Sequence, residues 1–110
     1  MIIETSINVW YNSYTSKLRI KYNLEKSLAL KSNPKRGASF EDAQEIFLHH
    51  NCEDMKNDDP IQFRIIGWIK GQLYTLIYEV RNDSKGEYFH LITLWKSTTQ
   101  ERKIYEKETK

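Results

Sequence analysis

The chain of 110 residues contains three histidines and one cysteine, side chains that proteins use for proton transfer and metal binding. His90 falls in a segment with strand-like alternation, and its imidazole gains or loses a proton near neutral pH. The adjacent His49 and His50 point in different directions, and together with Cys52 they lack the spacing of a zinc site. We therefore expect no metal. His90 is a candidate acid or base, with a structural histidine of the sheet surface as the alternative.

Charge is unevenly distributed along the chain, although the formal net charge is only +2. Residues 17–36 hold seven Lys or Arg and one Glu, whereas residues 41–59 hold seven Asp or Glu and one Lys. This asymmetry favours a surface that attracts anions, with part of the molecule turned away from them. Two solvated faces that differ in sign by chance are the alternative. Because the chain has no glycine-rich phosphate loop or dinucleotide fingerprint, we expect no cofactor.

The strands that must position these residues follow from apolar periodicity. Residues 17–22 alternate like a half-buried strand. Residues 61–69, 72–81 and 87–95 are rich in β-branched and aromatic residues and are separated by turn-forming residues, which predicts a three-stranded antiparallel meander. Residues 2–9 contain enough isoleucine and valine for a further short strand.

Helices are expected between the first strand and the meander, and after the meander. The first helix covers about residues 24–32 and ends before Pro34, because proline cannot continue a helix. The second begins with Ser39 as its cap and ends near residue 49 or 50. The third has a possible capping box in residues 97–101 and runs to about Lys107.

These elements predict a single α+β domain over residues 1–110 in the order β-α-α-β-β-β-α. We expect the helices to pack on one face of an antiparallel sheet. Residues 51–60 are expected to form a polar, acidic loop.

Three segments of the chain carry recognisable motifs. Residues 22–27 read Tyr-Asn-Leu-Glu-Lys-Ser, residues 35–43 read Lys-Arg-Gly-Ala-Ser-Phe-Glu-Asp-Ala, and residues 91–106 contain Lys-x-Thr-x-x-Glu-Arg-x-x-Tyr-Glu. These segments resemble the BrnT family of RelE-like toxins. The first is similar to the family's Trp/Tyr-Asp-x-x-Lys motif, the second to its Lys-His-Gly-Val-Ser-Phe-Glu-Glu-Ala, and the third to a motif that the family shares. Residues 1–16 are an N-terminal extension outside the resemblance.

The resemblance implies a RelE-like fold and the toxin of a type II toxin–antitoxin pair. Such a toxin is an endoribonuclease, and a BrnA-like antitoxin neutralises it in a hetero-oligomer. The implied reaction is metal-independent cleavage of RNA, in which the ribose 2′-hydroxyl attacks the adjacent phosphate. This chemistry needs a base, an acid and cations that stabilise the phosphorane.

Candidate residues can be assigned to these roles. The catalytic candidates are Lys26, Arg64, His90 and Lys96. The RNA-binding candidates are Lys35, Arg36, Trp95 and Arg102. Arginine offers a planar fork suited to phosphate, whereas lysine acts as a point charge. The alternative for the basic candidates is that they are solvated surface residues, as most lysines and arginines are. A stacking platform for bases could be formed by Trp68, Tyr78, Tyr88 and Trp95. The alternative is that these aromatics are core residues or cross-strand pairs, which is the commoner case in a sheet.

Three residues depart from the family pattern. Asn23, Arg36 and Trp95 stand where the family usually has Asp, His and Arg. The loss of a titratable group at Arg36 and of a cation at Trp95 weakens the prediction of catalysis but not that of the fold. The alternative function is therefore a catalytically inactive binding module of the same fold, which acts through protein–protein or RNA contacts.

The location of the protein is predicted from what the sequence lacks. A single cysteine excludes an internal disulfide, and no apolar run approaches the roughly 20 residues that span a bilayer. The first residues also lack the basic and apolar segments of a secretory signal. We expect a cytoplasmic protein without membrane contact.

Overall fold

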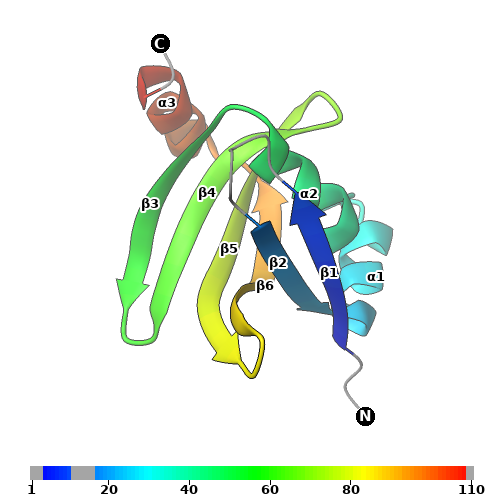
Figure 1. Cartoon of the computed structure of the whole chain (residues 1–110). Helices are drawn as coiled ribbons and strands as arrows, with labels where there is room; N and C mark the ends of the chain where they lie inside the picture. The colour runs from blue at the N-terminus through cyan, green and yellow to red at the C-terminus, as the bar shows by residue number, and fades with distance from the viewer. Residues whose placement is uncertain (1–3, 11–16, 109–110) are drawn as a thin grey trace.

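The meander predicted over residues 61–95 forms the centre of one sheet. The computed structural model describes residues 4–10 and 17–108, with side chains from residue 19 onward, and there the chain forms six strands and three helices. The strands are β1 (Glu4–Trp10), β2 (Lys17–Asn23), β3 (Asn51–Asp58), β4 (Ile61–Ile69), β5 (Gln72–Asp83) and β6 (Gly86–Lys96). The helices are α1 (Leu24–Ser32), α2 (Phe40–Leu48) and α3 (Thr99–Glu108). The sheet has the order β1-β2-β6-β5-β4-β3 (Figure 1).

The α+β class is confirmed, but the sheet is mixed, so the prediction of a purely antiparallel sheet was wrong. β2 runs parallel to β6, with Ile20 opposite Phe89, while the other neighbours are antiparallel. After β2, α1 and α2 carry the chain across the sheet to β3 at the opposite edge. The alternation of a strand shows which of its faces is buried, but not which neighbour it joins or in which direction.

Residues 51–60, expected to be a loop, contain the edge strand β3, so this prediction was also wrong. β3 pairs only with β4, and residues 53–58 are exposed. A strand in water on both faces needs no apolar alternation, and pairing with β4 is what makes it a strand. At the other edge, the expected N-terminal strand is present as β1. Residues 1–3 and 11–16 of the N-terminal extension lie outside the described residues.

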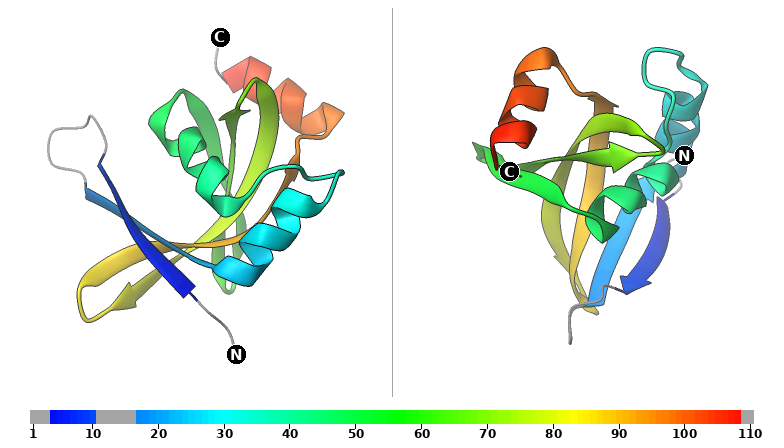
Figure 2. Two further views of the ribbon diagram at one scale, coloured as in Figure 1. Left: turned by 90° about the vertical axis from the view of Figure 1, so that its right-hand side faces the viewer. Right: turned by 90° about the horizontal axis from the view of Figure 1, so that it is seen from above.

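The sheet has two faces, which we name by the helices that cover them. The helix-pair face packs against α1 and α2 and includes Ile65 and Leu76 in the main core. The α3 face packs against α3 through Ile66, Leu73 and Tyr105. In the left view of Figure 2, strands of the sheet pass between α2 and α3. The expectation that all helices lie on one face was therefore wrong, because the few apolar residues of α3 do not indicate which face it covers.

Two local features place α2 on the sheet. Ser39 and Asp42 cap the helix reciprocally: the Ser39 Oγ accepts from the Asp42 N–H, and the Asp42 carboxylate accepts from the Ser39 N–H, both at 3.0 Å. The Lys31 Nζ donates to the same carboxylate at 2.7 Å and ties α1 to α2. On β4, a Cβ added at Gly67 would lie only 2.9 Å from the Ile46 Cγ2. The absence of a side chain there lets α2 lie directly on β4.

Candidate functional site

A row of polar side chains crosses the α3 face at a distance from α3. His90 of β6 lies opposite Glu79 of β5 on one side and opposite Lys21 of β2 on the other. Glu79 in turn lies opposite Gln62 of β4. Directly opposite residues of neighbouring strands point to the same face, so these four side chains form one row across four strands. We call it the His90 row.

The Glu79 carboxylate is held firmly within this row. The Gln62 Nε2 donates to it at 2.7 Å, and Arg81 donates through Nε and Nη2 at 2.9 and 2.7 Å. The bond from Gln62 lowers the pKa of Glu79 most; burial opposes this, and Arg81 and the charge of His90 add to the lowering. Glu79 is therefore an anion that lies beside His90 in the row.

Strand β2 contributes two cations, Lys21 within the row and Arg19 beside it. The Lys21 Nζ lies 2.9 Å from an Asp83 carboxylate oxygen and 4.4 Å from the centre of the Tyr88 ring. The Arg19 Nη2 lies 2.5 Å from the same oxygen, and its guanidinium lies 5.4 Å from the Tyr88 ring. Hydrogen bonds from Arg19 and Lys21 hold the pKa of Asp83 well below its usual range. The strand β2 thus brings positive charge to the side of His90.

A second polar group, which we call the Arg64 corner, lies on the same face beside α3. The Arg64 guanidinium donates two hydrogen bonds to the Asp54 carboxylate, from Nε to Oδ1 at 2.9 Å and from Nη2 to Oδ2 at 2.5 Å. Its Nη1 lies 4.0 Å from an oxygen of Glu101. The hydrogen bonds that Arg64 donates to Asp54 raise the pKa of Arg64 most; burial opposes this, and the charge of Asp54 adds to it. One cation thus faces two carboxylates.

Glu101 organises this corner. One oxygen of its buried carboxylate accepts from the Thr98 N–H, the Thr75 hydroxyl and the Trp95 indole at 2.8, 2.9 and 3.0 Å. Burial raises the pKa of Glu101, but these donors outweigh it and leave the pKa below its usual value. The Glu101 N–H donates to the Thr98 Oγ at 3.2 Å, which completes the capping box predicted for the third helix. The same carboxylate therefore starts α3 and orients Trp95.

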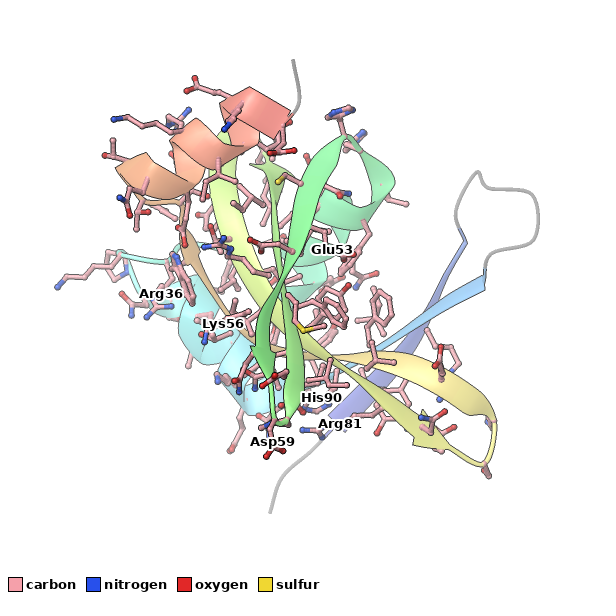
Figure 3. The ribbon with its side chains drawn as sticks, turned by 90° about the vertical axis from the view of Figure 1, so that its left-hand side faces the viewer. Arg36, Glu53, Lys56, Asp59, Arg81 and His90 are labelled. Atoms are coloured by element: carbon pink, nitrogen blue, oxygen red, sulfur yellow. The ribbon has the colours of Figure 1, made fainter. Side chains whose placement is uncertain are left out.

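Except for Arg102 of α3, the remaining basic candidates lie on the helix-pair side. Lys26 on α1, Lys35 in the following loop and Lys96 at the end of β6 are all exposed. Lys96 lies opposite a core residue of the helix-pair face. The Arg36 Nη1 donates to the Leu94 carbonyl oxygen at 2.5 Å. Figure 3 shows Arg36 in a different part of the molecule from His90. The four catalytic candidates are thus split, with only Arg64 and His90 on the α3 face.

The aromatic candidates do not form one platform. Tyr78 belongs to the core of the helix-pair face. Trp68 donates its indole N–H to the Tyr105 hydroxyl at 3.1 Å, and the Arg102 guanidinium lies 5.8 Å from the Trp68 ring. Trp95 is bound to Glu101. These contacts favour the alternative in which the aromatics serve packing: Tyr78 lies in the core, and Trp68 and Trp95 bind residues of α3.

The balance of charge divides the α3 face into two halves. The half with the His90 row holds three cations, Arg19, Lys21 and Arg81, against the carboxylates of Glu79 and Asp83. The Arg64 corner holds two carboxylates against one cation. A phosphate is therefore favoured at the His90 row, where an imidazole can exchange a proton and the cations outnumber the carboxylates.

Sequence reasoning missed four residues of this site: Lys21, Gln62, Glu79 and Arg81. Glu79 could have been found from the sequence, because a charged residue directly after the apolar run of β5 is a candidate site residue. The neighbourhood of Lys21 and His90 had no such signal, because it depends on the parallel pairing of β2 with β6.

Comparison with known proteins, metal sites and membrane helices gives four further findings. No model of a known protein family matches the chain, and no curated protein matches it. Within residues 4–10 and 17–108, no group of three or more His, Cys, Asp or Glu side chains is placed to hold a metal ion. In the same ranges, no helix has the length and apolar character needed to cross a membrane.

Proposed function

We propose that this chain is the endoribonuclease toxin of a type II toxin–antitoxin pair, similar to BrnT, and that it cleaves RNA at the His90 row. The observation that carries the proposal is the arrangement of His90 between Glu79 and Lys21, with Arg81 bound to Glu79. An imidazole, a carboxylate and cations are the groups that RNA transesterification uses. The order β2-α1-α2-β4-β5-β6-α3 also agrees with the order expected for the family, with β1 and β3 added at the edges.

In the proposed reaction, the ribose 2′-oxygen attacks the adjacent phosphorus and the bond from phosphorus to the 5′-oxygen breaks. Neutral His90 takes the proton of the 2′-hydroxyl, and Glu79 stabilises the imidazolium that forms. Arg81 and Lys21 stabilise the negative charge of the phosphorane. The 5′-oxygen leaves with a proton from water, so the products are a 2′,3′-cyclic phosphate and a free 5′-hydroxyl.

The test is cleavage of a labelled single-stranded RNA of mixed sequence by purified chain in excess EDTA. We expect fragments that end in a cyclic phosphate, and His90→Ala should lower the rate by about 10²- to 10⁴-fold. His49→Ala is the matched control, because His49 is an exposed histidine at the end of α2 and lies outside the row. Cleavage by His90→Ala at the wild-type rate would show that this site is not the catalytic one.

A second candidate function, the catalytically inactive binding module, is favoured by the splitting of the predicted catalytic residues. Lys26 and Lys96 lie away from the α3 face, and Arg64 is paired with Asp54. Under this alternative, the chain binds RNA or a protein partner and leaves RNA intact.

Expression of the chain alone in a bacterial host separates the two functions. Growth arrest with fragmented RNA, relieved by His90→Ala and by co-expression of a BrnA-like antitoxin, supports the toxin. Normal growth with intact RNA and a stable complex with a partner protein supports the binding module. In both cases the proposed site of action is the cytoplasm, where the RNA and the antitoxin are present.

A further inference from the structure

We infer that Arg64 is a second phosphate-binding site on the α3 face, and that the Asp54 carboxylate occupies this site until a phosphate of RNA displaces it. The identity of the ligand as RNA rests on the proposed function. The site itself rests on the geometry of the Arg64 corner.

Asp54 binds Arg64 in the way that a phosphate would. Two parallel hydrogen bonds, from Nε and Nη2 to the two carboxylate oxygens, match the fork-to-fork arrangement that arginine makes with phosphate oxygens. The Arg64 side chain is 25% exposed, so solvent and ligands reach the edge of the guanidinium. Asp54 therefore fills a position that an RNA phosphate can also fill.

The structure holds Asp54 less firmly than it holds Arg64. Asp54 is 45% exposed and lies on the edge strand β3, which has a neighbour on one side only. The β3–β4 register shifts between Met55 and Asn57, directly after Asp54, and such a bulge interrupts the ladder. Arg64 lies on β4, between β3 and β5. Displacement of Asp54 thus requires movement at the sheet edge alone.

Glu101 keeps the guanidinium in place during the exchange. The Glu101 carboxylate is buried and accepts hydrogen bonds from Thr98, Thr75 and Trp95. One of its oxygens lies 4.0 Å from the Arg64 Nη1, which is the guanidinium nitrogen without a bond to Asp54. While Asp54 stays bound, two carboxylates face one guanidinium, so the corner has no net positive charge to attract a phosphate. The Arg64 site is thus closed in the free protein, and the His90 row is the first contact for RNA.

The experiment compares Asp54→Asn with Asp58→Asn. Each variant removes one negative charge from β3, but Asp58 lies opposite Ile61 and not opposite Arg64. RNA binding is measured by fluorescence anisotropy, with His90→Ala as the background so that RNA stays intact. We expect Asp54→Asn to bind RNA about two- to fivefold more tightly than Asp58→Asn, which is the effect of releasing one partly exposed ion pair. Adding Arg64→Ala should abolish this difference.

A second measurement does not depend on RNA. In NMR spectra of the Asp54→Asn variant, the Arg64 Nε–Hε signal should shift on titration with inorganic phosphate, and in Asp58→Asn it should not. RNA binding with equal affinities for the two variants, or a difference that survives Arg64→Ala, would overturn the inference and leave the proposed function standing. A phosphate response at Arg64 without RNA binding would support the site and overturn the proposed function. Neither RNA binding nor a phosphate response would overturn both.

Discussion

Replacement of Glu101 by alanine should destabilise the protein strongly, whereas replacement by glutamine should destabilise it only mildly. The difference is that glutamine keeps an acceptor oxygen and alanine does not. The donors from Thr98, Thr75 and Trp95 all converge on one oxygen, Oε1. The other oxygen faces only the Trp95 indole at 3.3 Å and the Arg64 Nη1 at 4.0 Å. A glutamine can place its carbonyl oxygen at the Oε1 position and keep three bonds, whereas an alanine keeps none.

The magnitudes follow from the fate of each donor. In Glu101→Ala the Thr75 hydroxyl can turn to the Ser97 Oγ at 2.9 Å, so its loss is small. The Trp95 indole and the Thr98 N–H have no such substitute, and a lost bond to a charged acceptor costs about 1.5–3 kcal/mol. With partial relaxation, the free energy of unfolding should fall by about 3–4 kcal/mol in Glu101→Ala. Glu101→Gln loses the charge but keeps the bonds, and should cost about 1–2 kcal/mol.

The assay is urea unfolding at pH 7, followed by tryptophan fluorescence. Glu106→Ala is the control, because Glu106 is an exposed carboxylate of the same helix. Folding lowers the pKa of Glu101, so its contribution is present above the ordinary glutamate pKa of 4.5 and is lost as the pH falls below it. Glu101→Gln should therefore show a smaller loss of stability in acid than the wild type. Equal costs for Gln and Ala, or a cost of Ala below about 1 kcal/mol, would refute the reasoning.

Three further predictions concern other parts of the fold. Burial raises the pKa of Asp42, but hydrogen bonds led by that from Lys31 lower it to about 2 from 3.8. In acid and urea titrations Asp42→Asn should therefore cost about 2 kcal/mol at pH 7, and this cost should shrink below the unfolded-state pKa and vanish below the folded-state pKa. Gly67→Ala should lower stability by about 1–3 kcal/mol in urea unfolding, because the new methyl group meets Ile46 at 2.9 Å; an unchanged midpoint would contradict the close approach of α2. Burial, with nearby carboxylates, raises the pKa of Cys52, so its alkylation by iodoacetamide at pH 7.4 should be slower than that of a free thiol and should accelerate in urea.

Local structure could be predicted from the sequence wherever its signals come from neighbouring residues. Ser39 and Asp42 made the start of α2 predictable because a capping box involves residues three positions apart. The central strands were predictable for a similar reason, since alternation reports which face of a strand is buried. The strand β3 was not, because its pairing with β4 leaves both of its faces largely in water.

Which side chains come into contact depends on the packing of distant segments and could not be predicted from the sequence. The parallel pairing of β2 with β6 brings Lys21 beside His90, although 69 positions separate them in the sequence. The position of α3 on its own face brings Glu101 to Arg64 and leaves Lys26 and Lys96 on the opposite side. Strand order and helix side depend on contacts summed over the whole core, and no short segment of sequence encodes that sum. The sequence therefore showed which residue types could form a site, but it did not show which of those residues lie together.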